Sequence, residues 1–350
     1  MQIPEDPRDK PESDKTFGAD NAGVEALVRS YGCDHSSEFI EEMIMTALRM
    51  GRDRLSVADL KMINRALKEL RQAARVFSPY NAFRKIAVFG SARTDPGAPE
   101  YEAAVEFSRR MVEAGYMVIT GGGDGIMGAA QKGAGREHSF GLNINLPFEQ
   151  RANETIEGDP KLVNFNYFFT RKVNFLKETH AIALFPGGFG TMDEGFECLT
   201  LMQTGKSNII PLVVVDPPGG GYWSAWDRFL RDHLLGNGLI SPDDFHFYRY
   251  TTSIEEAVEE VQQFYRVFNS YRYVGDQMVI RLNHSLDQSS LAALNKEFAD
   301  LLMEGEFRQG SAMRAERNEP EIADLPRLIF QPHRRNFGRM RELIDFLNQQ

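Results

Sequence analysis

The chain has 350 residues, 42% of them hydrophobic, which is enough for a substantial core and for two or three structural units. The formal net charge of −10 disfavours a general nucleic-acid-binding surface. The two cysteines, Cys33 and Cys198, lack metal-ligand spacing, and no run approaches the roughly 18 apolar residues of a membrane span. We therefore expect a cytoplasmic protein with no membrane contact and no disulfide or zinc framework.

The first 80 residues precede any α/β pattern. Residues 1–20 combine three prolines with many charges and are expected to be disordered. Residues 21–80 form a predicted helical extension, because apolar residues recur at helical spacing. The predicted helices lie near residues 24–31, 39–48 and 60–74, the last starting at Ser56. Each has a single apolar stripe, so the extension is expected to pack on the core or at a subunit interface.

Residues 81–270 alternate between short apolar runs and amphipathic segments. Strands are predicted at 85–90, 117–120, 141–146, 181–185, 209–215 and 248–252. Helices are predicted at 101–114, from 126, from 171 with Thr170 as cap, from 191, at 223–234 and at 253–268. This order is typical of a doubly wound, Rossmann-like parallel sheet with its ligands at the carboxyl edge. The glycine spacing does not fit the dinucleotide fingerprint, so a dinucleotide cofactor is disfavoured.

Residues 274–350 differ in composition and are predicted to form a small α+β module. The pattern indicates strands at 278–282 and 328–331, helices at 286–302 and 336–347, and a polar loop over 304–326. A basic cluster comprises His333, Arg334, Arg335, Arg339 and Arg341. We interpret it as a solvated face, with a regulatory anion site as the alternative.

The most informative stretch is a strand, a glycine turn and a helix over residues 181–197. Pro186 and Gly187 end the strand, and Thr191 is a suitable N-cap for the helix. Backbone N–H groups and the helix dipole at such a turn form an anion cradle, most often for phosphate. Glu194 and Glu197 lie three residues apart on one helix face beside this cradle. Glu194 also fits a capping box with Thr191, in which case its role is structural.

Five segments together resemble the LOG ("Lonely Guy") family of nucleotide phosphoribohydrolases, long mislabelled as lysine decarboxylases. The signature is Pro-Gly-Gly-Phe-Gly-Thr-Met-Asp-Glu over 186–194. The four other segments are 89–93 (FGSAR), 120–128 (TGGGDGIMG), 141–150 (GLNINLPFEQ) and 168–172 (FFTRK). The resemblance covers residues 85–265. Gly128 stands where many bacterial members carry glutamate.

The resemblance implies hydrolysis of the N-glycosidic bond of a nucleoside 5′-monophosphate, a purine nucleotide or cytokinin ribotide, to free base and ribose 5-phosphate. By that resemblance Glu194 and Arg171 are the catalytic residues. The implied substrate-binding residues are Gly121, Gly122, Gly123, Gly125, Lys172, Gly187, Gly188, Gly190 and Thr191, with Ser91 and Glu197 as candidate phosphate or ribose contacts. The reaction needs no metal or organic cofactor. Family members are at least dimers, so a homo-oligomer is expected.

Two other functions fit the same scaffold less well. Relatives of this fold include nucleotide sensors and a carrier of the molybdenum cofactor, so a non-catalytic binding protein is the alternative. A carrier has no need of paired Arg171 and Glu194. An amino-acid decarboxylase would need a Schiff-base lysine, and nothing around Lys172 marks it as one. No motif identifies the base, and the role of the flanking segments stays open.

Overall fold

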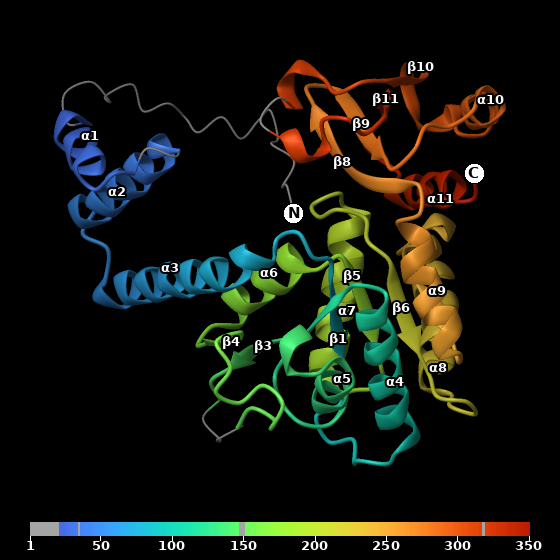
Figure 1. Cartoon of the computed structure of the whole chain (residues 1–350), viewed down its shortest axis with the longest axis horizontal. Helices are drawn as coiled ribbons and strands as arrows, with labels where there is room; N and C mark the ends of the chain where they lie inside the picture. The colour runs from blue at the N-terminus through green and yellow to red at the C-terminus, as the bar shows by residue number, and fades with distance from the viewer. Residues whose placement is uncertain (1–20, 34–35, 147–150, 317–318) are drawn as a thin grey trace. The chain divides into compact units, whose positions relative to one another are not determined.

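The computed structural model describes residues 21–33, 36–146, 151–316 and 319–350, with the course of the chain drawn in Figure 1. The described residues up to Arg71 form one compact unit, and those from Gln72 onward form a second. The tail predicted over 1–20 and the turn of the family segment over 147–150 lie outside the described residues. In the described part of the chain, no helix combines the length and apolarity that crossing a membrane requires.

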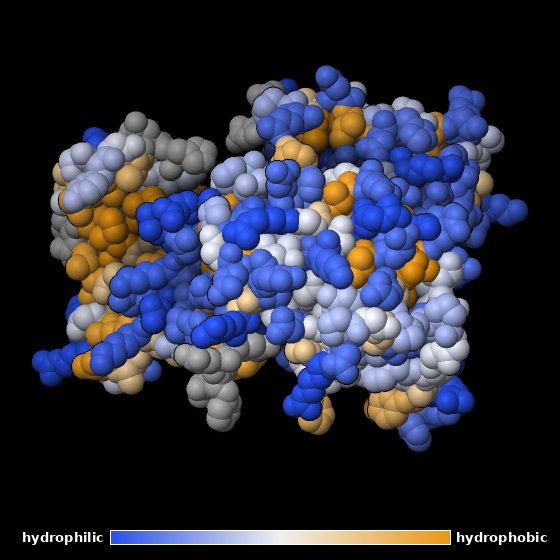
Figure 2. Space-filling view, turned by 60° about the horizontal axis from the view of Figure 1, so that its bottom comes forward, coloured by the Kyte–Doolittle hydropathy of each residue, from blue (hydrophilic) through white to orange (hydrophobic). Residues whose placement is uncertain are grey.

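The smaller unit consists of helices, as the apolar spacing predicts. They are α1 (Asn21–Ser30), α2 (Ser37–Arg52) and most of α3 (Val57–Phe77), whose last turn belongs to the larger unit. The Asp59 amide donates to Ser56 Oγ at 3.1 Å, which confirms the predicted start of α3. Many large apolar side chains are exposed here, including Leu27, Tyr31, Phe39, Met43, Leu48, Val57, Leu60 and Leu67. Figure 2 shows apolar side chains gathered over these helices.

A seven-stranded parallel sheet organises the larger unit. Its strands are β1 (Lys85–Phe89), β2 (Met117–Thr120), β3 (Ser139–Ile144), β4 (Leu162–Phe165), β5 (Ala181–Leu184), β6 (Leu212–Val215) and β7 (Arg249–Thr251). The spatial order is β4-β3-β2-β1-β5-β6-β7, and the predicted doubly wound sheet is confirmed. The chain therefore works outward from β1 to β4 and then returns to place β5 beside β1. Ligands bind at such switch points in parallel α/β sheets.

Helices cover both faces of this sheet. They are α4 (Pro99–Glu113), α5 (Ile126–Ala134), α6 (Phe168–Glu178), α7 (Phe189–Gln203), α8 (Tyr222–Phe229), a π-helix (Leu230–Leu235) and α9 (Ile254–Phe264). Alternate residues of β1 enter different cores, because successive strand side chains point to opposite faces. Ile86 and Val88 pack in one core with α4, α5 and α9. Ala87 and Phe89 pack in the other with α6 and α7.

Some element bounds differ from those predicted. The strand β4 was not predicted, because Val163 and Phe165 alternate with Asn164 and Asn166 in a run too short to stand out. Thr170 is not the cap of α6, which begins two residues earlier at Phe168, and its hydroxyl donates to the Tyr167 carbonyl at 2.9 Å. At α9 the expected cap is confirmed, since Ser253 Oγ accepts from the Glu256 amide.

The C-terminal module contains a four-stranded antiparallel sheet of order β10-β11-β9-β8. Its elements are β8 (Phe268–Val274), β9 (Gln277–Leu282), α10 (Gln288–Glu297), β10 (Leu302–Gly310), β11 (Arg327–Pro332) and α11 (Phe337–Leu347). The predicted loop over 304–326 is wrong in its first part, where β10 is a polar edge strand. Such a strand exposes most of its side chains and shows no apolar alternation. The predicted helix over 253–268 is also too long, because Phe268 begins β8.

The module shares one hydrophobic core with the parallel sheet. The Asn348 side chain, 1% exposed, accepts from the amides of Val267 and Phe268 and donates to the Phe264 carbonyl. Arg341 is also buried, pairing with Glu260 and Asp345. Arg339 pairs with Asp300 and Glu342. Arg334 pairs with Asp276 at 3.7 Å, so three arginines of the predicted basic cluster are engaged in ion pairs.

Candidate active site

The largest cavity at the switch point has a volume of about 820 Å³ and opens at the carboxyl ends of β1, β2 and β5. This volume suits a nucleotide-sized ligand. The lining of this cavity includes eight of the site residues predicted from the sequence: Ser91, Gly121, Arg171, Gly187, Gly188, Gly190, Thr191 and Glu194.

Close backbone packing explains two of the glycines. The Ser91 amide donates to the Pro186 carbonyl at 3.0 Å, which joins the turn after β1 to the turn after β5. A Cβ atom on Gly187 would lie 2.2 Å from Thr191 Oγ1, and one on Gly121 would lie 2.9 Å from Arg171 Nη2. A side chain at Gly187 would displace Thr191, and one at Gly121 would displace Met127, whose Sδ would lie 2.7 Å away, or Arg171.

The helix α7 begins earlier than predicted, and this changes the interpretation of Glu194. Its N-cap is Gly188, with no side-chain cap, so the predicted N-cap role of Thr191 is wrong. The two-glycine turn lets the helix start at Phe189, without a polar cap. Glu194 consequently lies nearly two turns into the helix, too far along for a capping box, which requires the third helical position. The N–H groups of Thr191 and Met192 donate to the Gly188 carbonyl, so the N–H groups of Phe189 and Gly190, which line the cavity, are those that precede the intrahelical hydrogen bonds of α7.

Glu194 is the carboxylate with the most unusual environment in this cavity. Its side chain is 8% exposed. Burial raises its pKa from 4.5 to about 7, although the positive charges of Arg171 and Lys172 act in the opposite direction. A carboxyl group with a pKa near neutrality can both accept and donate a proton under physiological conditions.

Arg171 lies in the second turn of α6 and is fixed from two sides. Its Nε donates to the Leu142 carbonyl, within β3, at 2.9 Å. Its guanidinium carbon lies 5.2 Å from the Phe175 ring centroid. Burial lowers the pKa of Arg171, while the charges of Glu194 and Asp193 raise it. The group nevertheless stays cationic at neutral pH, because an arginine starts from a very high pKa.

Lys172 and Glu197 lie outside the cavity lining and pair with each other. Lys172 Nζ lies 2.7 Å from a Glu197 carboxylate oxygen and 2.8 Å from one of Asp193. This bridge ties α6 to α7 and so fixes Arg171 relative to Glu194. Roles for Lys172 and Glu197 in ligand contact remain predictions.

The glycine turn after β2 faces in two directions. Gly121 lines the main cavity, whereas Gly125 lines an adjoining cavity of about 470 Å³ together with Arg93, Asp124 and Lys132. Gly122 and Gly123 line neither cavity, and their carbonyls accept from the Asn153 side chain. The predicted ligand contacts of Gly122, Gly123 and Gly125 stay predictions.

Sequence reasoning missed several residues of the cavity wall. The Tyr222 hydroxyl donates to the Gly187 carbonyl at 2.5 Å and so fixes the signature turn from the start of α8. Phe189, within the signature itself, is 97% exposed beside the cavity, and Phe168 is 54% exposed. Phe189 could have been predicted as a cavity residue, because a large aromatic residue is unusual in a glycine turn. Tyr222 follows a glycine-rich turn, and nothing in its local pattern indicates this contact.

Comparison with known proteins gives several relatives of the larger unit. Residues 127–261 match the family model described as "Possible lysine decarboxylase". A cytokinin riboside 5′-monophosphate phosphoribohydrolase of Arabidopsis thaliana is 26% identical over 190 residues, covering 52% of this chain and 84% of that protein. One of Oryza sativa subsp. japonica is 26% identical over 200 residues, covering 56% and 80%. The resemblance to the LOG family is confirmed.

The family-model match contains Arg171 and Glu194 and stops short of the C-terminal module. Among solved structures, a Moco carrier protein from Chlamydomonas reinhardtii is 17% identical and covers 52% of this chain and 96% of that one, with a TM-score of 0.36. Within the part of the chain that the structure describes, no group of three or more His, Cys, Asp or Glu side chains is placed to hold a metal ion.

Proposed function

We propose that this protein hydrolyses the N-glycosidic bond of a nucleoside 5′-monophosphate to a free base and ribose 5-phosphate. The observation that carries the proposal is the buried Glu194 carboxyl, with a pKa of about 7, in a cavity of about 820 Å³ shared with Arg171 and two glycine turns. The curated relatives are named for this reaction on cytokinin ribotides, which supports the reaction class.

The proposed reaction begins with the 5′-phosphate at the signature turn. The N–H groups at the start of α7 and the positive end of its dipole stabilise a phosphate there. Because α7 also carries Glu194, binding at its N-terminus sets the distance between the phosphate and the carboxylate. The exposed rings of Phe168 and Phe189 offer stacking surface for the base.

Bond cleavage builds positive charge on the ribose as the C1′–N bond lengthens. The ionised Glu194 stabilises that charge while the bond lengthens, and it then accepts a proton from the attacking water. The water oxygen forms the new bond to C1′. The electron pair of the broken bond leaves with the base, which takes up the proton that Glu194 removed from the water, so Glu194 returns to its ionised form. Arg171 orients the substrate beside Glu194 through its remaining guanidinium N–H groups.

A panel of substrates tests this proposal. Purified protein is incubated with AMP, GMP, CMP, UMP and an N6-isopentenyl AMP, and free base is separated by chromatography. Release of base from at least one monophosphate is expected. Binding of these nucleotides without any release would contradict hydrolysis and favour the carrier function.

A further inference from the structure

The family segment that begins at Gly141 contains two asparagines to which the proposed reaction assigns no role, Asn143 and Asn145. Asn143 belongs to β3, and Asn145 directly follows its last residue, Ile144. Leu142 and Ile144 pack in the core with α6 and α7, so the alternate residue Asn143 faces the other side of the sheet. Asn143 also lines the main cavity, at the carboxyl end of β3.

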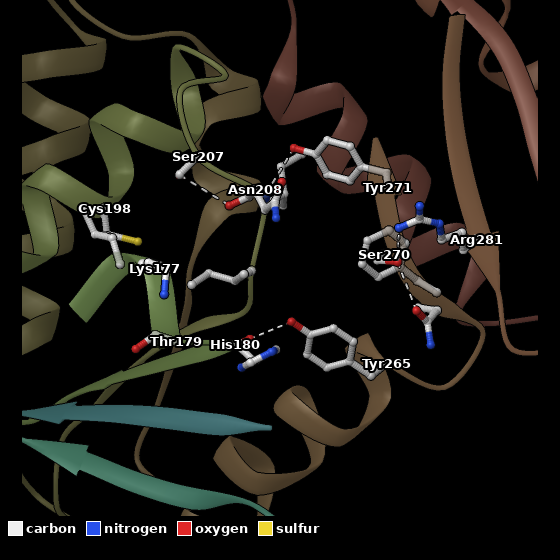
Figure 3. A pocket seen from close by; sticks show the side chains of 15 residues that line it. Lys177, Thr179, His180, Cys198, Ser207, Asn208, Tyr265, Ser270, Tyr271 and Arg281 are labelled. Atoms are coloured by element: carbon white, nitrogen blue, oxygen red, sulfur yellow. Dashed lines mark hydrogen bonds between the residues drawn. The ribbon is translucent and has the colours of Figure 1, made fainter. Parts of the chain in front are cut away.

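Buried polar groups in this protein are commonly satisfied by hydrogen bonds between elements. Figure 3 shows this between the parallel sheet and the C-terminal module, where the Tyr265 hydroxyl donates to the His180 carbonyl at 2.6 Å. The Tyr271 hydroxyl accepts there from the Ile209 amide at 3.3 Å. The buried amide of Asn348 likewise uses both its oxygen and its nitrogen. Such pairing is the norm, because an unpaired buried polar group costs stability.

The amide of Asn143 is paired at one end only. Its Nδ2 donates to Asn164 Oδ1, at the paired position of β4, at 3.0 Å. In the part of the chain that the structure describes, nothing donates to its Oδ1. The residue is 8% exposed, yet Oδ1 retains accessible surface, because it is not one of the fully enclosed atoms without a partner. A buried acceptor that stays open to a cavity is available to a ligand.

The position of Asn143 in the sheet matches the base of a bound nucleotide. The phosphate lies at the turn after β5 in the proposed reaction, and β3 is three strands away in the order β3-β2-β1-β5. At about 4.8 Å between neighbouring strands this separation is about 14 Å, close to the length of an extended nucleoside monophosphate. Leu146 and Phe168, which follow β3 and β4, are 40% and 54% exposed and line the same cavity. They offer apolar surface to the faces of the base, and Asn143 offers an acceptor to its edge.

We propose that Asn143 recognises the base of the substrate, by accepting at Oδ1 a hydrogen bond from an amino group on the edge remote from the sugar, such as N6 of adenine. Asn164 holds the amide in place through Nδ2. The assignment rests on the proposed function, which places the phosphate at the signature turn. It makes Asn143 a residue that sets the preference among bases.

Purine riboside 5′-monophosphate, which is AMP without its amino group, isolates this contact. The value of kcat/KM for both nucleotides is measured with wild type, Asn143→Leu and Asn145→Leu. Leucine keeps the approximate size of asparagine and removes the amide. In Asn143→Leu the preference for AMP over purine riboside 5′-monophosphate should therefore fall about fivefold, the value of one neutral hydrogen bond. Differences in leaving-group ability between the two bases cancel when this preference is compared between proteins.

Asn145→Leu is the matched control. Asn145 Nδ2 donates to Asn166 Oδ1 at 3.2 Å, the same kind of cross-strand bond that Asn143 makes, but Asn145 is exposed and lies outside the cavity lining. The control should keep the wild-type preference for AMP. If Asn143→Leu does not fold, Asn143→Ala makes the same comparison.

An unchanged preference for AMP in the Asn143 variant would overturn the inference, as would an equal fall in Asn145→Leu. A loss of preference for AMP over 2′-deoxy-AMP, with the amino-group preference intact, would place Asn143 at the ribose and overturn it too. If wild type hydrolyses no nucleotide, the proposed function fails, and calorimetric dissociation constants of AMP and purine riboside 5′-monophosphate then test Asn143 in the same way. Equal constants, or no binding by wild type, would overturn the inference as well.

Discussion

Replacing Glu194 by glutamine separates a catalytic carboxyl group from a structural one. Glutamine keeps the size of the side chain and cannot ionise. The folded protein holds a proton on Glu194 up to a pKa of about 7, whereas the unfolded chain releases it near 4.5. Ionising Glu194 therefore costs stability, and the free energy of unfolding of wild type should fall as pH rises through that window.

The magnitude follows from the two pKa values. Each pKa unit corresponds to about 1.4 kcal/mol, so the raised pKa of Glu194 costs about 3 kcal/mol above pH 7. Glu194→Gln is free of this cost. We expect the two proteins to differ little at pH 4.5 and the variant to be more stable by about 3 kcal/mol at pH 8.

Urea unfolding at several pH values measures this difference. The buried Trp223 and Trp226 provide the fluorescence signal. Glu197→Gln is the control, because Glu197 is more exposed and its loss removes an ion pair with Lys172. The stability of Glu197→Gln relative to wild type should not increase as pH rises. Parallel pH dependences for wild type and Glu194→Gln would refute the proposed environment of Glu194.

The remaining predictions concern turnover and assembly. Glu194→Gln should reduce turnover by about a hundredfold or more, as expected for loss of a general base. Glu197→Gln should reduce turnover less. Near-wild-type turnover in Glu194→Gln would exclude the mechanism. The wild-type rate should rise with pH through about 7, because the reaction uses ionised Glu194, and a rate independent of pH from 6 to 8 would argue against a base of this pKa. Adenosine should react at least about tenfold more slowly than AMP in kcat/KM, since it lacks the phosphate held at α7, and equal rates would contradict the phosphate site. Arg171→Ala should lose both affinity and turnover, and Arg171→Lys should not restore them, because lysine lacks the planar guanidinium. The protein should sediment as a dimer or larger species at micromolar concentration, because α1–α3 expose many apolar side chains; a monomer would contradict this.

The sequence predicts the parallel sheet well, because its central strands are short, continuous apolar runs that end at glycine turns. Strands β1, β2 and β5 come within one residue of the predicted bounds, and α5 starts at the predicted residue. Prediction fails where tertiary contacts replace local signals. The polar strand β10 forms by pairing with β11, and the start of α7 depends on the backbone of Gly188.

The same distinction applies to the candidate site. Arg171, Glu194 and most of the signature turn are identified by motif, and the topology brings them to one cavity. The ion pairs of Lys172 could not be predicted, because they depend on how α6 and α7 pack. The Tyr222 contact likewise depends on residues far apart in the sequence, because Tyr222 and Gly187 meet 35 positions apart.

The most direct test of the proposed function follows both products of one reaction. AMP, or the best monophosphate in the panel, is incubated with wild type and with Glu194→Gln, and free base and ribose 5-phosphate are quantified together. We predict equimolar amounts of the two products with wild type and a loss of both with the variant. Neither product from wild type, or base released without ribose 5-phosphate, would contradict hydrolysis of the N-glycosidic bond.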